Sequence, residues 1–270
     1  MAAAAVWSAA TADSGGNPRL VLDTDLGRLT LELAADAAPR TVSRVVALAA
    51  GGAYDGSVVC ESRAGGFVVL GCLPETLPGE APKAVPSPAG WPDEIDPRAL
   101  GLDRRPLGGP REIDLLWQLE IYPRYLELLE RGEPVPPGLA GLIARLRAEG
   151  TAATRILLGK SRLWYLHAIG FDYPLRGSGL PVRRGSVATA SVWPGEADAR
   201  ILIALTDLPE RDGRATVYGH VASGWPALAA IAAAPVDKDH RPREPIRIRS
   251  AAPIAATAVA NGTVRDPGGS

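Results

Sequence analysis

Two stretches of strand-like sequence enclose a helical block in this chain, and that arrangement limits the folds open to it. In residues 19–34, apolar side chains alternate with other residues around a turn at 25–27, which predicts a β-hairpin. After the helical block, strand patterns return at residues 185–191, 200–205, 215–222 and 245–251. Neither flank has enough strands to bury both faces of a sheet alone, so we expect one shared β-barrel.

Each flank also carries one predicted helix. Residues 38–54 begin with Pro39, which suits a first helical turn, and end at a Gly-Gly pair. Residues 225–234 predict a second, shorter helix. Between the first helix and the helical block, two apolar runs at 58–61 and 67–70 predict a further pair of strands joined by a tight glycine turn.

The helical block shows apolar residues at helical spacing. Leu115, Leu119, Tyr122, Leu126 and Leu129 are spaced 4, 3, 4 and 3, which predicts one face of a helix. Pro123 lies inside this pattern, so we expect it to kink the helix or to split it. Further helices are predicted over residues 139–146 and 156–168.

Composition excludes several classes of function. The chain has 270 residues, of which 46% are hydrophobic, and its net charge is −1, which argues against nucleic-acid binding. No run of 18 apolar residues predicts a membrane span. The three histidines are dispersed without metal-ligand spacing, so we expect no metal site.

Two segments that cover about half of the chain resemble the cyclophilin family of peptidyl-prolyl isomerases. In the first, Asp36, Ala38, Pro39, Thr41 and Val42 match the family's D-x-A-P-x-T-V, and residues 52–56 match G-x-Y-D-G. In the second, RGSVATAS and RILIALTDLPERDGRATVYGHV are similar to the family's later strands. The resemblance implies a closed antiparallel barrel of eight strands capped by two helices, with the helical block as an excursion.

The same resemblance implies a domain organisation. Residues 19–252 would form the cyclophilin-like domain, with a loop and helical insert at about 73–184 similar to that of a bacterial subgroup. Residues 1–18 would be a disordered leader or the remnant of an export signal, and residues 253–270 a flexible tail. The location therefore stays open between cytoplasmic and exported, and the oligomeric state is not predicted.

The activity that the resemblance implies needs no cofactor and no covalent step. Rotation about an X–Pro bond is slow because amide resonance sets a barrier of about 18–20 kcal/mol. Members of the family hold the proline in an apolar pocket, and an arginine donates to the prolyl nitrogen as resonance is lost. The expected partners are therefore proline-containing peptides or client proteins.

The family's arginine is absent from its usual place. Counted forward from Gly56, the family's F-H-R positions fall on Val59, Cys60 and Glu61. Counted back from Phe67, the arginine position falls on Ser62. Arg63 lies nearby, and it either reaches the peptide groove or pairs with Glu61 at the surface. Arg200 replaces the family's glutamine on the opposite wall, where it either donates to a peptide or lies solvated at a strand edge.

The remaining groove positions are also altered. The residues that the resemblance assigns to peptide binding are Phe67, Val68, Leu70, Ala190, Ser191 and Leu202. Leu70 stands in place of glutamine and Ser191 in place of asparagine. Glu210 and Arg211 stand where an aromatic residue and leucine are usual. These changes leave two functions open: a weak peptidyl-prolyl isomerase, or a non-catalytic module for peptide binding or assembly.

Both cysteines of the chain lie on the predicted pair of strands. Cys60 and Cys72 are about equally far from the turn at Gly65 and Gly66, so they should face one another across the hairpin. Either they form a disulfide, which would indicate an oxidising compartment, or they are two reduced residues packed as small apolar side chains.

Overall fold

Eight strands and a set of helices make up the computed structural model, which describes residues 17–74, 83–86, 91–175, 177–191, 193–194 and 197–254. The leader and tail predicted at the two ends lie almost wholly outside these residues. The strands are β1 Arg19–Thr24, β2 Gly27–Leu33, β3 Val58–Arg63, β4 Phe67–Cys72, β5 Ser186–Thr189, β6 Ile201–Ala204, β7 Val217–Ser223 and β8 Ile248–Ile254.

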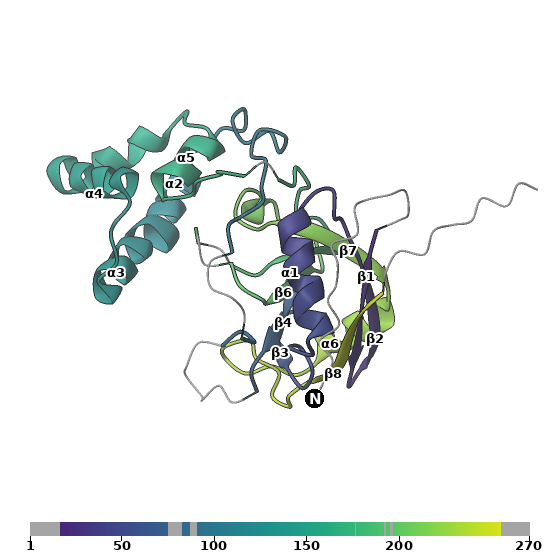
Figure 1. The fold of residues 1–270 in the computed structure, drawn as a ribbon. Coiled ribbons are helices and arrows are strands. Elements are labelled where there is room, and N and C mark those ends of the chain that lie inside the picture. The colour runs from purple at the N-terminus through teal and green to yellow at the C-terminus, as the bar shows by residue number, and fades with distance from the viewer. Residues whose placement is uncertain are drawn as a thin grey trace, which may run out of the picture.

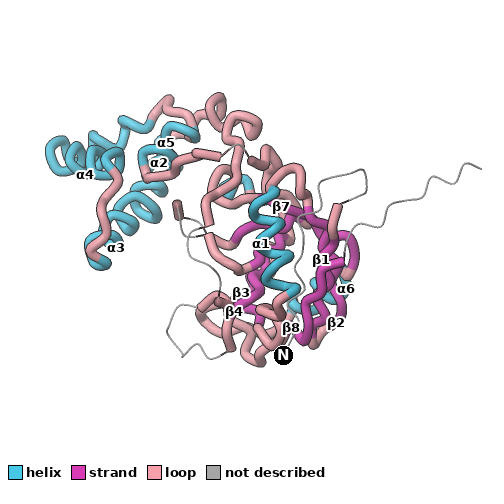
Figure 2. Tube along the Cα trace, viewed as in Figure 1, coloured by secondary structure: helices cyan, strands magenta, loops and turns pink. Residues whose placement is uncertain are grey.

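Helices and single turns connect these strands. They are α1 Pro39–Ala50, α2 Pro110–Leu116, the π-helical turn η1 Trp117–Ile121, α3 Tyr122–Arg131, α4 Pro137–Glu149, the 3-10 helix η2 Gly150–Leu157, α5 Arg162–Ala168, the 3-10 turn η3 Pro209–Arg211 and α6 Trp225–Ala233. Helices α2 to α5 all lie between β4 and β5 and form a separate group beside the sheet, whereas α1 and α6 pack close to it (Figures 1 and 2).

The strands form one antiparallel sheet that is curled but open. Their order is β3-β4-β6-β5-β7-β2-β1-β8, so β3 and β8 are its two ends. Strand β8 pairs with β1 along its length, and it meets β3 only near its start, at an isolated bridge between Val58 and Arg247 and the backbone bonds beside it. The prediction of a closed barrel is therefore wrong, because no continuous ladder joins the end strands.

Three separate apolar clusters stabilise the fold. The first fills the inside of the curled sheet beneath α1 and α6, with Leu20, Leu31 and Val68 among its fully buried members. The second lies among the helices between β4 and β5 and includes Ile121 and Leu166. The third, which we call the Phe67 cluster, covers the opposite face of β4, since alternate residues of a strand point to opposite faces.

Pro123 is accommodated without breaking its helix. The ladder widens in η1, where the N–H of Tyr122 donates to the carbonyl of Trp117 five residues earlier. Pro123 has no N–H to donate, and a π-helical turn just before it lets the helix continue from α2 through α3.

No helix in the described parts of the chain is long and apolar enough to span a membrane.

Candidate functional site

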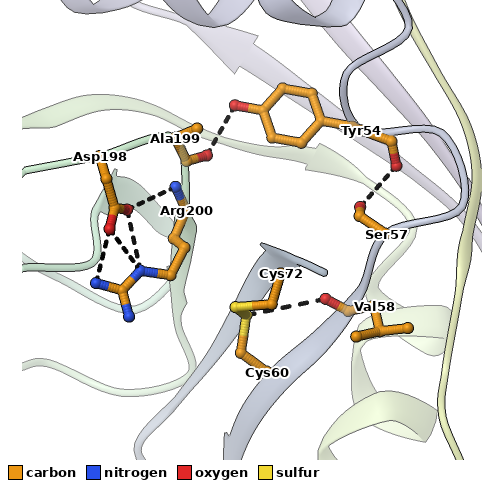
Figure 3. The surroundings of a disulfide bond; sticks show 8 residues. All are labelled: Tyr54, Ser57, Val58, Cys60, Cys72, Asp198, Ala199 and Arg200. Atoms are coloured by element: carbon orange, nitrogen blue, oxygen red, sulfur yellow. Dashed lines mark hydrogen bonds and ion pairs between the residues drawn. A yellow bond between two sulfur atoms is a disulfide. The ribbon is translucent and has the colours of Figure 1, made fainter. Parts of the chain in front are cut away.

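The β3–β4 hairpin forms one wall of the site that the sequence singles out. Its register pairs Arg63 with Phe67 next to the turn and Val58 with Cys72 at the other end, with shifts on either side of Val59. A disulfide joins Cys60 to Cys72, and their Cα atoms are 5.6 Å apart (Figure 3). The partner of Cys72 across the ladder is Val58, so the bulge at Cys60, and not a direct cross-strand pairing, brings the two sulfurs together.

Neither position that replaces the expected arginine, Glu61 or Ser62, offers a free donor. Cys60, beside them in the chain, is held in the disulfide. Ser62 is buried, and its hydroxyl donates to the carbonyl of Ile231 in α6 at 3.3 Å. The Glu61 carboxylate is ion-paired with Arg63. The polar groups of these three residues are therefore engaged in contacts within the protein.

Arg63 takes the surface alternative. Its guanidinium pairs with Glu61, and half of its side chain is exposed. The guanidinium carbon lies 5.7 Å from the centre of the Phe67 ring, at the outer range of a cation–π contact. Arg63 therefore borders the Phe67 cluster while its charge is already neutralised.

Arg200 is also engaged by a carboxylate. Its Nε lies 3.0 and 2.9 Å from the two oxygens of Asp198, and its Nη2 lies 2.8 Å from Oδ2 (Figure 3). The neighbouring carbonyl of Ala199 accepts a 2.8 Å hydrogen bond from the buried Tyr54 hydroxyl, which fixes the entry to β6. Burial raises the pKa of Tyr54, so this hydroxyl stays a donor. Arg200 is thus held at the start of β6 by Asp198.

The Phe67 cluster brings several of the predicted peptide-binding residues together. Phe67 packs with Leu202, which is fully buried beneath it, and Ala190 lies partly exposed at the edge. Strands β4 and β6 are paired here, with Val69 opposite Leu202. The remaining members of the cluster are Val58, Cys60, Cys72, Val182, Ala188, Ala204, Leu208, Ala215 and Val217.

Three predicted peptide-binding residues lie elsewhere. Val68 and Leu70 are fully buried in the cluster inside the sheet, on the face of β4 opposite Phe67, and are therefore removed from the site. The hydroxyl of buried Ser191 donates to the carbonyl of Trp193 at 3.0 Å and accepts from its N–H, closing a local turn. These positions follow from strand alternation and from local turn bonding, and the peptide-binding role expected of the three residues stays a prediction.

Arg211 is the residue that the sequence analysis did not select. Its guanidinium carbon lies 4.3 Å from the centre of the Phe67 ring, and its Nη1 donates to the carbonyl of Ala190 at 3.4 Å. Glu61 and Glu210 act on it through space, and neither forms a hydrogen bond with it. Burial lowers the pKa of the Arg211 guanidinium, the sign of a desolvated cation. The available signal was a charge at a position that is apolar in the resembled family.

Residues of the helical group hold the loop that carries Arg211. The carboxylate of Glu120, in the π-helical turn η1, accepts hydrogen bonds from Arg214 and, at 2.6 Å, from the Tyr165 hydroxyl. Nη2 of Arg162, at the start of α5, donates to the carbonyl of Glu210 at 3.0 Å. The position of Arg211 over Phe67 therefore depends on contacts from a part of the chain far away in sequence.

A second carboxylate anchors the same loop from inside. Asp212 is buried, and its Oδ1 accepts from the N–H of Val182 at 2.8 Å while Arg105 lies 3.3 Å from Oδ2. The Tyr173 hydroxyl donates to the carbonyl of Gly213 at 2.7 Å.

No cluster of three or more potential metal ligands occurs among the described residues. The chemistry offered by the site is thus an aromatic ring, apolar neighbours and one guanidinium.

Comparisons with known proteins identify the fold and the family. A family model described as cyclophilin type peptidyl-prolyl cis-trans isomerase matches residues 19–252. Peptidyl-prolyl cis-trans isomerase-like 3 of Gibberella zeae is 36% identical over 69 residues, which are 25% of this chain and 41% of that protein. The match therefore spans less than half of that relative.

Solved structures agree with the family match at the level of the fold. Two structures of a Cryptosporidium parvum cyclophilin type peptidyl-prolyl cis-trans isomerase superpose with TM-scores of 0.53 and 0.52 at 16% identity. They cover 89% and 88% of this chain and 99% of the other chain, and the second was solved in the presence of the dipeptide Ala-Pro.

Proposed function

Because the chain belongs to the cyclophilin-type peptidyl-prolyl cis-trans isomerase family, we propose that it binds X–Pro segments of polypeptides at the Phe67 cluster and isomerises them slowly. The observation that carries this proposal is the Arg211 guanidinium, which lies over the Phe67 ring without a carboxylate partner among the described residues. It is the one arginine beside Phe67 whose donors are not already committed to an acid.

The proposed chemistry uses that guanidinium as the donor to the prolyl nitrogen. As the X–Pro bond twists, resonance is lost and the nitrogen becomes a hydrogen-bond acceptor, so a donor that meets it there lowers the barrier. A desolvated guanidinium is a stronger electrostatic donor than one in water. The ring of Phe67 and the apolar residues beneath it would hold the proline side chain.

The same geometry predicts that the rate is low. The guanidinium of Arg211 stacks on the aromatic face that a prolyl ring would otherwise contact, so peptide binding has to displace it. Leaving a cation–π contact of this kind costs about 0.5–2 kcal/mol. In addition, neither residue at the expected arginine position supplies a guanidinium: Glu61 is ion-paired with Arg63, and the hydroxyl of Ser62 donates to the carbonyl of Ile231.

A chromogenic proline-isomerisation assay tests this proposal. We expect the unmodified protein to accelerate isomerisation measurably but far below a typical cyclophilin measured in parallel. Arg211→Ala should reduce kcat/KM at least tenfold, whereas Arg63→Ala and Arg200→Ala, whose guanidinium groups are already paired, should change it less than threefold. Rates typical of the family, or an unchanged rate in Arg211→Ala, would contradict the assignment.

A second candidate function is a non-catalytic module that binds proline-containing peptides. It is favoured by the absence of arginine at the family's position, which falls on Glu61 or Ser62: Glu61 is ion-paired with Arg63, and Ser62 is buried. Calorimetric titration with an Ala-Pro peptide separates the two functions: binding that Arg211→Ala weakens, without any acceleration of isomerisation, would establish the module.

The proposal includes the domain organisation expected from the sequence. We propose that residues 19–252 are one cyclophilin-like domain, that residues 73–184 are an insert of the kind found in a bacterial subgroup, and that residues 1–18 and 253–270 are a leader and a tail. The position of α2 to α5 between β4 and β5 supports the boundaries of the insert. Limited proteolysis with mass spectrometry tests it, since the leader and the tail should be cleaved before the domain.

A further inference from the structure

The helix that runs from α2 through η1 to α3 exposes a row of large apolar side chains. The row consists of Leu115, Leu119, Tyr122, Leu126 and Leu129, which are between 40% and 69% exposed. We call these five residues the apolar row. The sequence predicted a helix face from these residues, and the structure leaves that face uncovered.

The apolar row is not needed for the core of its own helical group. The same helix buries a different set of residues against its neighbours, namely Ile113, Leu116, Trp117, Ile121 and Leu128. The helix is therefore apolar on two sides, and only one of them faces the protein. Exposed apolar surfaces of this kind mark interaction sites in soluble proteins.

The spacing of the apolar row is nearly the same in both chain directions. Counted from Tyr122, its members lie at −7, −3, 0, +4 and +7. A two-fold axis through Tyr122 would therefore place Leu115 of one copy against Leu129 of the other, and Leu119 against Leu126. The π-helical turn η1 lies between Leu115 and Tyr122, so this match holds for positions along the helix axis, and the row shifts around the helix at that turn.

The area of the apolar row matches what a dimer needs. Five large side chains that are each about half exposed leave on the order of 500 Å² of apolar surface open per copy. A stable interface buries about 800 Å² per partner, of which roughly 60% is apolar. The apolar row thus supplies nearly all of the apolar surface that one side of such an interface contains.

A cleft along the same helix extends this surface. Its volume is about 740 Å³, and its lining includes Trp117, Tyr122, Leu146 and Leu158. Tyr122 belongs to both the cleft and the apolar row, so the ridge and the recess are adjacent on one face. Two-fold related copies can place a ridge of each beside the recess of the other, which is the arrangement of an isologous interface.

We propose that this face is the dimer interface of the protein, with two copies of the α2–η1–α3 helix packed antiparallel about Tyr122. Helices α3 and α4 lie at the end of the helical group that is farthest from the sheet, so the sheet does not obstruct a second copy (Figure 1). The apolar row shares no residue with the Phe67 cluster.

Sedimentation velocity on the full chain over micromolar concentrations tests the dimer. The unmodified protein should sediment as a dimer, and Leu119→Glu, which alters the most exposed member of the apolar row, should weaken association at least tenfold. Leu26→Glu is the matched control, because Leu26 is a 41% exposed leucine in the turn between β1 and β2. Circular dichroism establishes that both variants are folded.

Cysteine cross-linking tests the antiparallel arrangement. Tyr122→Cys lies on the proposed axis, so it should cross-link to itself under mild oxidation. Leu115→Cys and Leu129→Cys should cross-link to each other when the two variants are mixed, and neither should cross-link alone. Self-linking of each of these two variants would indicate a parallel pair and overturn the proposed geometry.

A monomeric unmodified protein at all concentrations would overturn the proposal, as would a dimer that Leu119→Glu leaves intact. If the protein is monomeric and Leu119→Glu instead abolishes its ability to suppress aggregation of an unfolded test protein, the apolar row binds client chains, which also overturns it.

Discussion

At the scale of single residues, Asp93 carries an unusual carboxyl group. It is buried just before the helical group, and burial raises its pKa to about 7. The hydroxyl of Tyr173 is close enough to be affected, since Asp93 contributes to the raised pKa of that group. A carboxyl whose pKa is higher in the folded than in the unfolded chain weakens folding whenever it is ionised.

The effect of Asp93 on stability therefore depends on pH. Below its ordinary pKa of 3.8 the carboxyl is neutral in both states, so it has no effect. As the pH rises from there to about 7, the unfolded chain ionises first, and stability falls by up to roughly 4 kcal/mol in order of magnitude. Above pH 7 the full penalty remains.

Replacing Asp93 with asparagine should remove this penalty. We expect Asp93→Asn to stabilise the protein at pH 8 and to have little effect at pH 4, as measured by urea unfolding at both values. Asp36→Asn, at an exposed position in the turn before α1, serves as the control and should be neutral at both. A difference for Asp93→Asn that is the same at both pH values would show that the carboxyl is not the cause.

Arg211 illustrates which features of the site could be predicted from the sequence and which could not. The resemblance assigned the missing arginine to the β3–β4 hairpin, whose register is local. It could not show which arginine lies over Phe67, because Arg211 is placed by a loop that Glu120, Arg162 and Asp212 hold from other parts of the chain. Contacts of such long range leave no periodic trace in the sequence.

At the scale of elements, strand patterns were more informative than helix faces. Alternation predicted the β1–β2 hairpin, and Pro39 with the Gly-Gly pair predicted the helix α1, each to within a few residues. The apolar row also had clear helical spacing, but the structure buries the other side of that helix. Periodicity reports that a face is apolar, and it does not report what covers the face. Likewise, whether the sheet closes into a barrel depends on the pairing of its end strands β3 and β8, which no local sequence pattern encodes.

The disulfide gives a prediction for the β3–β4 hairpin. We expect no free thiols in unfolded, unreduced protein, as measured by thiol titration. The double change Cys60→Ser with Cys72→Ser should destabilise the domain by about 3 kcal/mol, because the bond closes a loop of 12 residues in the unfolded chain. Two free thiols per chain in freshly isolated material would contradict the bond.

The π-helical turn η1 gives a second prediction at this scale. Glu120→Gln should leave the buried Arg214 without its counter-charge, at a cost of about 3 kcal/mol, and should loosen the loop that carries Arg211. Hydrogen exchange should therefore increase in residues 208–214. Glu127→Gln is the matched control, because within the described part of the chain Glu127 pairs with Arg124 and Arg131 on the same helix and with no residue of that loop. Equal exchange in both variants would show that Glu120 does not position the loop.

At the scale of the whole molecule, the separate clusters indicate that the sheet and the helical group are distinct folding units. The cluster inside the sheet contains no residue between Trp91 and Val187, whereas the helical cluster lies wholly between Leu102 and Phe171, apart from Leu100, Tyr173 and Trp193 packed at its edge. The chain leaves and returns at one place, because the N–H of Asp96 donates to the carbonyl of Ser178 at 3.0 Å.

Residues 97–177 should therefore be removable. Replacing them by a flexible Gly/Ser linker of about eight residues adds little closure entropy. The deletion keeps Glu94, whose carboxylate accepts hydrogen bonds from the N–H and the hydroxyl of Thr41 at 2.6 and 2.7 Å. Glu94 thereby caps α1. We expect a β-rich protein that unfolds in one cooperative transition, monitored by circular dichroism in urea. It should have lost isomerase activity, since Glu120 and Arg162 no longer hold the loop of Arg211. A deletion variant that cannot fold would show that the helical group is part of the core, and one that folds with full activity would show that Arg211 needs no support from it.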